Sequence, residues 1–363
     1  MDKGAAGSAG RKRVQVTISF RRFFLLLLPL AKATLRPMKS NITEETCNGI
    51  SGYRLFSGGY SAFICAHMGA NCIQLTKDDV SLLRTPPSRE QFAAQPNLYG
   101  IPLLFPPNRI KEGRYMFEGR VYRFPINEPE RGHHIHGFLS STPFKPKARW
   151  YNETQAHISF VYEAAADDPY LQFGHTFKVE SAFSLSEDGL GHALTITNTS
   201  EIEMPVGVGF HTTFNADFLG TGKEEEYVLC LDAGQEILID RPTFIPTGEY
   251  VQSNELLETL RQGTYRPYTQ SLSNHFTTKR EPVHELWYRH QPSRTSIHYS
   301  AESPLDYWML FNKGGCEGFV CAEPQTWIID APNSKLAPEQ SGFRSLGPQQ
   351  SLTLRSRLSM TAG

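Results

Sequence analysis

Three histidines stand close together in the stretch GHHIHGF, at positions 133, 134 and 136. So many imidazole groups could bind a metal ion, serve a polar substrate as acids, bases or hydrogen-bonding groups, or simply lie on the surface. In an extended segment His134 and His136 would share a face, and Gly132 and Gly137 suggest tight bends at both ends. A metal site needs a carboxylate and a further histidine, and no Glu follows at close spacing, which disfavours the metal.

A further histidine, His211, lies in MPVGVGFHTTFNADF, residues 204–218. If this stretch is a strand, Gly207, Gly209 and His211 share one face, and apolar side chains fill the other. Glycines in a strand often mark the close approach of a ligand or another backbone. The pattern favours a site near His211, while a structural histidine at a strand end remains the alternative.

Two more segments carry polar groups in apolar surroundings. In GFVCAEPQTWIIDAPN, Pro324 biases Glu323 towards extended geometry, and Trp327 offers a flat apolar ring suited to the C–H face of a sugar. In GIPLLFPPNRIKEG, prolines flank the apolar run, and Arg109 is the one charged group in its first ten residues, where it could hold hydroxyls or a carboxylate. An exposed glutamate, a core tryptophan and a surface salt bridge are the alternative interpretations.

The elements that must position these residues have the pattern of β-strands. Short runs alternate apolar and polar residues and are separated by Gly, Pro, Asn or Asp, as in HISFVYEA and GHALTITNTS. RYMFEGRVYRF predicts a hairpin that turns at Glu118 and Gly119. The best helix candidate is NELLETLRQG, with Asn254 as N-cap and Gly263 just past its end. The sequence therefore predicts an all-β protein, a large antiparallel β-sandwich formed by residues 39–363 as a single domain.

Composition excludes some partners and leaves others open. The 36 Lys and Arg residues against 37 Asp and Glu residues give a net charge of −1, so neither nucleic acid nor a membrane surface is an expected partner. Six cysteines without CxxC spacing predict free thiols rather than a disulfide framework or a zinc site. Residues 1–38 have the composition of a leader, and a signal-like basic and apolar stretch spans residues 11–33. We expect a cytoplasmic protein, or a secreted one if that stretch acts as a signal, and either a monomer or a homodimer.

Taken in order, four segments resemble the aldose 1-epimerase (galactose mutarotase-like) family: NRIKEG, IHGF, FHTTF and EPQTWIIDAPN. The resemblance covers nearly all of residues 53–360 and implies a β-sandwich enzyme that interconverts the α and β anomers of a hexose. It implies Glu323 as general base and His211 as general acid. It also implies that Arg109 and His136 hold sugar hydroxyls, and we add Asn108, Asn274 and Trp327 as substrate-binding candidates.

Two features qualify the resemblance. Family members usually supply a sugar-binding aspartate where this chain has Ser273 and Asn274. Phe138 after the His-Gly pair is similar to the hexose-6-phosphate epimerase branch, whereas Glu-Pro-x-Thr-Trp points to the free-sugar branch. One acid and one base are sufficient for ring opening, and we expect no metal and no nucleotide cofactor, in keeping with the lack of a P-loop or GxGxxG motif. The alternatives are a hexose-6-phosphate 1-epimerase, a non-catalytic carbohydrate-binding sandwich and, last, a retaining glycosidase, which needs two carboxylates about 5 Å apart.

Overall fold

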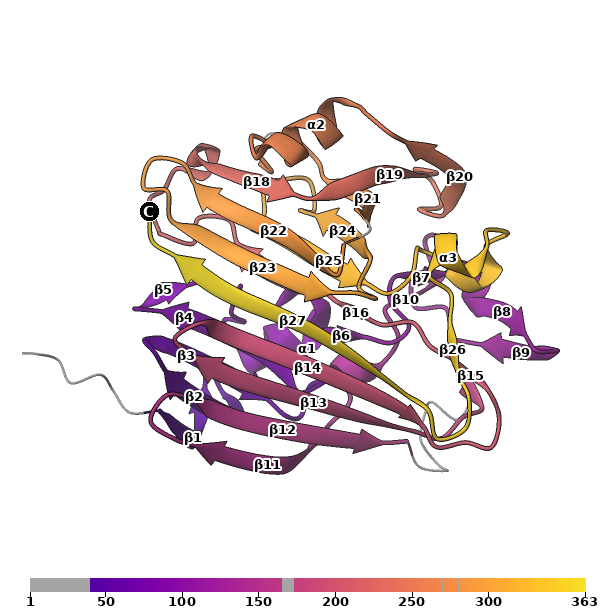
Figure 1. Cartoon of the computed structure of the whole chain (residues 1–363), viewed down its shortest axis with the longest axis horizontal. Helices are drawn as coiled ribbons and strands as arrows, with labels where there is room; N and C mark the ends of the chain where they lie inside the picture. Colours follow the sequence, from indigo (N-terminus) through magenta and orange to yellow (C-terminus); the bar gives the residue numbers. More distant parts are fainter. Residues whose placement is uncertain (1–39, 165–172, 269, 280) are drawn as a thin grey trace, which may run out of the picture. The chain divides into compact units, whose positions relative to one another are not determined.

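Three antiparallel sheets dominate the structure, a computed structural model that describes residues 40–164, 173–268, 270–279 and 281–363 (Figure 1). The first sheet has eight strands, in the order β11 (Lys145–Tyr151), β12 (Ala156–Glu163), β13 (Phe177–Ser186), β14 (Gly189–Asn198), β27 (Ser351–Thr361), β23 (Ser296–Glu302), β22 (Val283–His290) and β18 (Tyr227–Leu231). The second sheet runs in the order β20 (Pro246–Val251), β19 (Ala233–Ile239), β21 (Ser273–Thr278), β24 (Tyr307–Phe311), β25 (Phe319–Gln325), β16 (Gly209–Phe210) and β6 (Leu103–Leu104), and β17 (Thr212–Asn215) also pairs with β25. The third sheet is made of β1 (Asn41–Cys47), β2 (Ile50–Ser57), β3 (Tyr60–Cys65), β4 (Asn71–Lys77) and β5 (Val80–Ser81).

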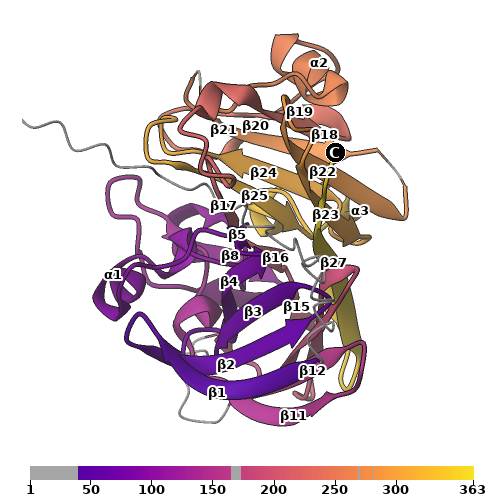
Figure 2. The ribbon, with the colours of Figure 1, turned by 90° about the vertical axis from the view of Figure 1, so that its left-hand side faces the viewer.

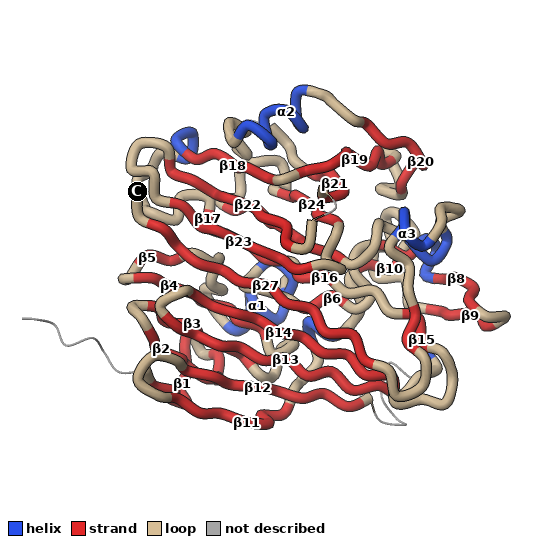
Figure 3. Tube along the Cα trace, viewed as in Figure 1, coloured by secondary structure: helices blue, strands red, loops and turns tan. Residues whose placement is uncertain are grey.

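Short strand pairs and helices make up the rest of the regular secondary structure in the described residues. Figure 3 shows how much of the chain is strand. The pairs are β7 (Arg109–Ile110) with β10 (His134–Ile135), β8 (Arg114–Phe117) with β9 (Arg120–Arg123), and β15 (Met204–Pro205) with β26 (Ser345–Leu346). The α-helices are α1 (Arg89–Ala94), α2 (Glu255–Gln262) and α3 (Pro338–Ser341), and single 3-10 turns lie at Pro96–Leu98, Lys111–Gly113, Leu139–Ser141, Glu224–Glu226 and Ala331–Asn333. None of the helices described is long and apolar enough to cross a membrane.

The second and third sheets both pack against the first sheet. β2 and β3 contact its strands β12 and β13. Phe214 of the second sheet lies against Tyr288 and Tyr299 of the first, with ring centroids 6.4 and 6.1 Å apart. Figure 2 shows the second and third sheets on the same side of the first sheet. The large antiparallel β-sandwich expected from the sequence is therefore confirmed.

Local sequence signals account for several of these elements. In β12 and β14 the alternating apolar residues are buried, which places them on the core face. Glu118 and Gly119 both have positive φ, 47° and 73°, as a two-residue turn between β8 and β9 requires. The Asn254 side chain caps α2 by accepting a hydrogen bond from the Leu257 backbone N–H, and Gly263 ends the helix at φ 68°.

Two further expectations concern the cysteines and the leader. All six cysteines are free, as predicted, and Cys72 and Cys321 are buried. The expected leader at residues 1–38 lies outside the described residues.

Candidate active site

The second sheet brings His211 and Glu323 together, although more than a hundred residues separate them in the sequence. The stretch predicted as one strand is divided into β15, β16 and β17, and the last two pair with β25. Their registers join Gly209 to Gln325 and Thr212 to Ala322, so His211 lies directly across from Glu323. His211 Nε2 and Glu323 Oε1 are 3.2 Å apart, and both side chains are about 95% buried or more, at 5% and 2% exposure.

Burial shifts the two groups in opposite directions. It raises the pKa of the Glu323 carboxyl to about 8, against the charge of Arg109 and a hydrogen bond from Gln325. It lowers the pKa of the His211 imidazole to about 4. Between these two values the pair holds one titratable proton. By these pKa values the proton lies on Glu323, and its transfer to the His211 imidazole produces a carboxylate base beside an imidazolium acid.

Gln325 fixes the direction of this carboxylate. Its Nε2 lies 3.3 Å from Glu323 Oε2, and its side chain is fully buried. Pro324 between them keeps the strand extended, so both side chains of β25 face the same way. The expectation that Pro324 would orient Glu323 agrees with this geometry.

His136 joins the pair from the β7–β10 ribbon. Its ring is nearly perpendicular to the His211 ring, with centroids 5.1 Å apart, and its backbone N–H donates to the Asn108 carbonyl. His136 has a φ of 65°, which is rare for a residue other than glycine, and Gly137 follows at 67°. A Cβ on Gly137 would collide with the Phe105 backbone, so this tight bend requires glycine.

The bend at His136 overturns the expectation that His134 shares its face. His134 is fully buried, its Nδ1 lies 2.8 Å from the Pro125 carbonyl oxygen, and its ring packs against Phe124 and Phe138. The positive φ at His136 breaks the extended geometry on which a shared face depends. His134 is therefore a core residue rather than part of the site.

Arg109 lies beside the histidines and is held by Glu128, a residue that no local sequence signal marks. Its Nε and Nη2 each donate to a Glu128 carboxylate oxygen over 2.7 Å. Arg131 also donates to Glu128, and both guanidinium groups lie over the Phe244 ring. Burial works against the charge of Glu128, but the hydrogen bonds and charge of Arg109, with those of Arg131, lower its pKa.

Asn108 supports Arg109 rather than pointing away from it. Its Oδ1 accepts a hydrogen bond from the Arg109 backbone N–H over 3.1 Å, and lies 3.4 Å from Arg109 Nη1. Asn108 has a φ of 56° and is 2% exposed. Asn108, Arg109 and His136 therefore form one connected group next to His211.

Trp327 does not lie in this site, contrary to the expectation of a sugar-stacking ring. It is 1% exposed, stacks on Phe343, and its Nε1 lies 3.4 Å from the Pro107 carbonyl oxygen. A Cβ on Gly207 would overlap the indole ring. Trp327 therefore fills the space that Gly207 leaves, and no ligand can occupy it. An indole ring can pack flat against a strand only where the strand has no side chain in the way.

Asn274 is also misplaced for the role expected of it. Its partner across the sheet is Leu310, which is next to Met309, the partner of Glu323. Since neighbouring residues of a strand point to opposite faces, Asn274 and Glu323 lie on opposite faces of the second sheet. Asn274 instead donates to Glu236 over 2.5 Å, and Glu236 also accepts from Asn254 at the start of α2.

The β21 residues that share the face of Glu323 are Ser273 and His275. His275 pairs with Met309 across the sheet, is fully buried, and neither ring nitrogen has a hydrogen-bond partner among the residues described. Burial lowers its pKa to about 3. Within the described residues no three His, Cys, Asp or Glu side chains are grouped as metal ligands.

The chain matches a family of known description and resembles several solved structures. Residues 53–359 match the family described as aldose 1-epimerase. The chain is 28% identical to YihR of Escherichia coli over 218 residues, which cover 59% of this chain and 65% of YihR, just under two thirds of its length. A galactose mutarotase-like protein of Clostridium acetobutylicum superposes with a TM-score of 0.85 at 27% identity, over 90% of this chain and 99% of the other.

A more distant structure has the same fold. The galactose 1-epimerase of Lactobacillus acidophilus superposes with a TM-score of 0.64 at 13% identity, over 90% of this chain and 99% of the other. Because the family match extends over most of the chain, it decides the classification. The chain belongs to the aldose 1-epimerase family.

Proposed function

We propose that this protein is an aldose 1-epimerase that interconverts the α and β anomers of a free hexose, with Glu323 as base and His211 as acid. The observation that carries the proposal is the buried contact of 3.2 Å between the imidazole and the carboxylate. The C1 hydroxyl oxygen and the ring oxygen of a hexose are bonded to the same carbon. A base and an acid that serve these two atoms must therefore lie close together, as this pair does.

The reaction needs only the movement of two protons. The Glu323 carboxylate takes the proton of the C1 hydroxyl, and the C1–O bond to the ring oxygen breaks as His211 Nε2 gives that oxygen a proton. The aldehyde then rotates about its bond to C2, and the ring closes from the other side with the two roles exchanged. Positioned acid and base groups of this kind contribute about 10² to 10⁴ in rate.

Neighbouring groups would hold the sugar in place. Arg109 Nη1 and the His136 ring are the donors next to the pair, and Arg109 keeps its direction through Glu128. Two of the Arg109 nitrogens are already engaged by a carboxylate, which compensates its charge. This neutralisation favours a free hexose over a hexose 6-phosphate, whose phosphate would need an uncompensated cation.

The test is NMR exchange spectroscopy between the α and β anomers of several hexoses, free and 6-phosphorylated. We expect His211→Asn and Glu323→Gln each to reduce the exchange rate by about 10² or more. His298 and Glu285 form a second His–Glu contact, 3.1 Å long, on the exposed face of the first sheet, so His298→Asn and Glu285→Gln are matched controls. Sugar binding without faster exchange would instead support the carbohydrate-binding sandwich.

A further inference from the structure

A pocket opens at the edge of the second sheet, and neither His211 nor Glu323 is among its lining residues. Its volume is about 980 Å³, and its walls come from β19, β20, β21, the start of β24 and α3. Tyr307 lines the pocket and pairs across the sheet with Gln325, whereas Glu323 pairs with Met309, two residues further along. Successive residues on one face of a strand are about 7 Å apart, so the pocket begins one step along the sheet from the candidate active site.

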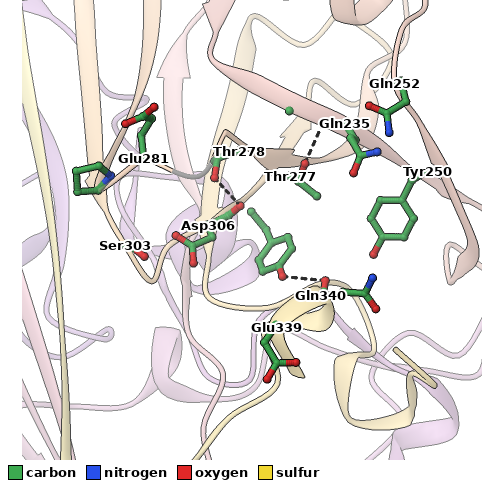
Figure 4. Close-up of a pocket in the computed structure, with 13 residues that line it drawn as sticks. Gln235, Tyr250, Gln252, Thr277, Thr278, Glu281, Ser303, Asp306, Glu339 and Gln340 are labelled. Carbon is green, nitrogen blue, oxygen red and sulfur yellow. Dashed lines mark hydrogen bonds between the residues drawn. The ribbon is translucent and has the colours of Figure 1, made fainter. Parts of the chain in front are cut away.

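Polar side chains point into this pocket, and several of them have no hydrogen-bond partner among the residues that the structure describes (Figure 4). The side-chain amides of Gln235, Gln252 and Gln340 make no hydrogen bond to any residue that the structure describes. The Tyr250 hydroxyl is buried and likewise has no partner there. Each of these groups can both donate and accept hydrogen bonds, and a buried hydroxyl without a partner is unfavourable.

Hydrogen bonds between side-chain hydroxyls and backbone groups connect the pocket walls. The Tyr307 hydroxyl donates to the Gln340 carbonyl over 2.9 Å, which ties β24 to α3. The Gln235 backbone N–H donates to Thr277 Oγ1 over 2.9 Å, and Thr278 Oγ1 donates to the Asp306 carbonyl over 3.0 Å. A site built on strands in this way is preorganised for its ligand.

The charged side chains that line the pocket are all acidic. Asp306, Glu281 and Glu339 contribute three carboxylates, and none of the described lining residues is Lys or Arg. His284 lies behind Asp306, with Nε2 3.0 Å from its Oδ1, and is not itself a lining residue. Carboxylates accept hydrogen bonds from hydroxyl groups but repel phosphate, sulfate and other carboxylate groups.

We propose that this pocket is a second carbohydrate-binding site, which takes a neutral hexose ring independently of the reaction at His211 and Glu323. The amides and carboxylates bind its hydroxyls, and the rings of Tyr250 and Tyr307 offer apolar surface to its C–H groups. The pocket volume is at the upper end of the usual range for small-molecule sites, about 300–1,000 Å³, and is ample for one sugar ring.

Methyl glycosides test this site, because they lack the C1 hydroxyl and cannot be turned over. The full chain is labelled at the threonine methyl groups and titrated with methyl glucoside, methyl galactoside and methyl mannoside. We expect the signals of Thr277 and Thr278 to shift and saturate with at least one sugar, both in the wild type and in Glu323→Gln. The signals of Thr195 and Thr353, whose hydroxyls are hydrogen-bonded to each other in the first sheet, should not shift.

Loss of the tyrosine hydroxyl supplies the second measurement. Tyr250→Phe should weaken the affinity seen at Thr277 and Thr278 by about 2- to 10-fold, the usual effect of one hydrogen bond. Tyr151→Phe, on the exposed strand β11, is the matched control and should bind as the wild type does. The proposal is wrong if no sugar shifts the two threonines, if Tyr250→Phe binds equally well, or if glucose 6-phosphate binds this pocket as tightly as the neutral sugars.

Discussion

Replacing Glu323 by glutamine should stabilise the protein increasingly as the pH rises. Burial raises the pKa of this carboxyl from its ordinary 4.5 to about 8 in the folded state. Below pH 4.5 the folded and unfolded states both carry the proton. Between about pH 4.5 and about pH 8 the unfolded chain has released its proton while the folded state still holds it, and the loss levels off once the folded state also ionises. The wild type therefore loses stability over this range, and a glutamine does not.

The size of the effect follows from the two pKa values. At about 1.36 kcal/mol per pKa unit, the total loss above pH 8 is about 5 kcal/mol. Between about pH 6.5 and about pH 9 the stability advantage of Glu323→Gln should grow by about 2 kcal/mol. This window is chosen because His211, whose pKa is lowered by burial, destabilises the fold only as the pH falls below its ordinary 6.5.

Urea unfolding followed by tryptophan fluorescence measures this difference at the two pH values. Glu153→Gln is the control, since Glu153 is exposed and the structure shows no ion pair for it. It should change the free energy of unfolding little at either pH. An advantage for Glu323→Gln that stays constant, or shrinks, between the two pH values would show that burial does not hold this carboxyl protonated.

Three further predictions concern the site and its supports. The exchange rate between anomers should have a bell-shaped pH profile, because the catalytic pair has no free base below about pH 4 and no acid above about pH 8; a flat profile across this range would contradict the mechanism. Gly207→Ala should lower the free energy of unfolding by about 2 kcal/mol, because the new Cβ overlaps the Trp327 ring. Gly191→Ala is the control in the same urea assay and should change this free energy little, because its Cβ would be 3.7 Å from the nearest neighbour. Glu128→Gln leaves a buried arginine unpaired, so it should cost about 3 kcal/mol of stability and raise the KM for hexose. Glu130→Gln, at the exposed end of the same ion-pair cluster, is the control and should have neither effect.

Much of the fold could be predicted from the sequence because its signals are local. Alternation of apolar and polar residues marks β12 and β14, and Asn254 and Gly263 mark the ends of α2. These signals depend on the residues of one segment and on how it lies against a core, not on which other segment is its neighbour. The glycines before His211 likewise favoured a site there, whereas the role of Glu323 came from the family resemblance of its segment.

Only the tertiary structure decided what each candidate touches. The register between strands distant in the sequence turned Asn274 towards Glu236 of β19 and placed His275 on the face of Glu323. The packing of Trp327 onto Gly207, and the ion pair between Arg109 and Glu128, likewise depend on how separate segments meet. A shift of one residue in a register moves every side chain of a strand to the other face, and no single segment records that choice.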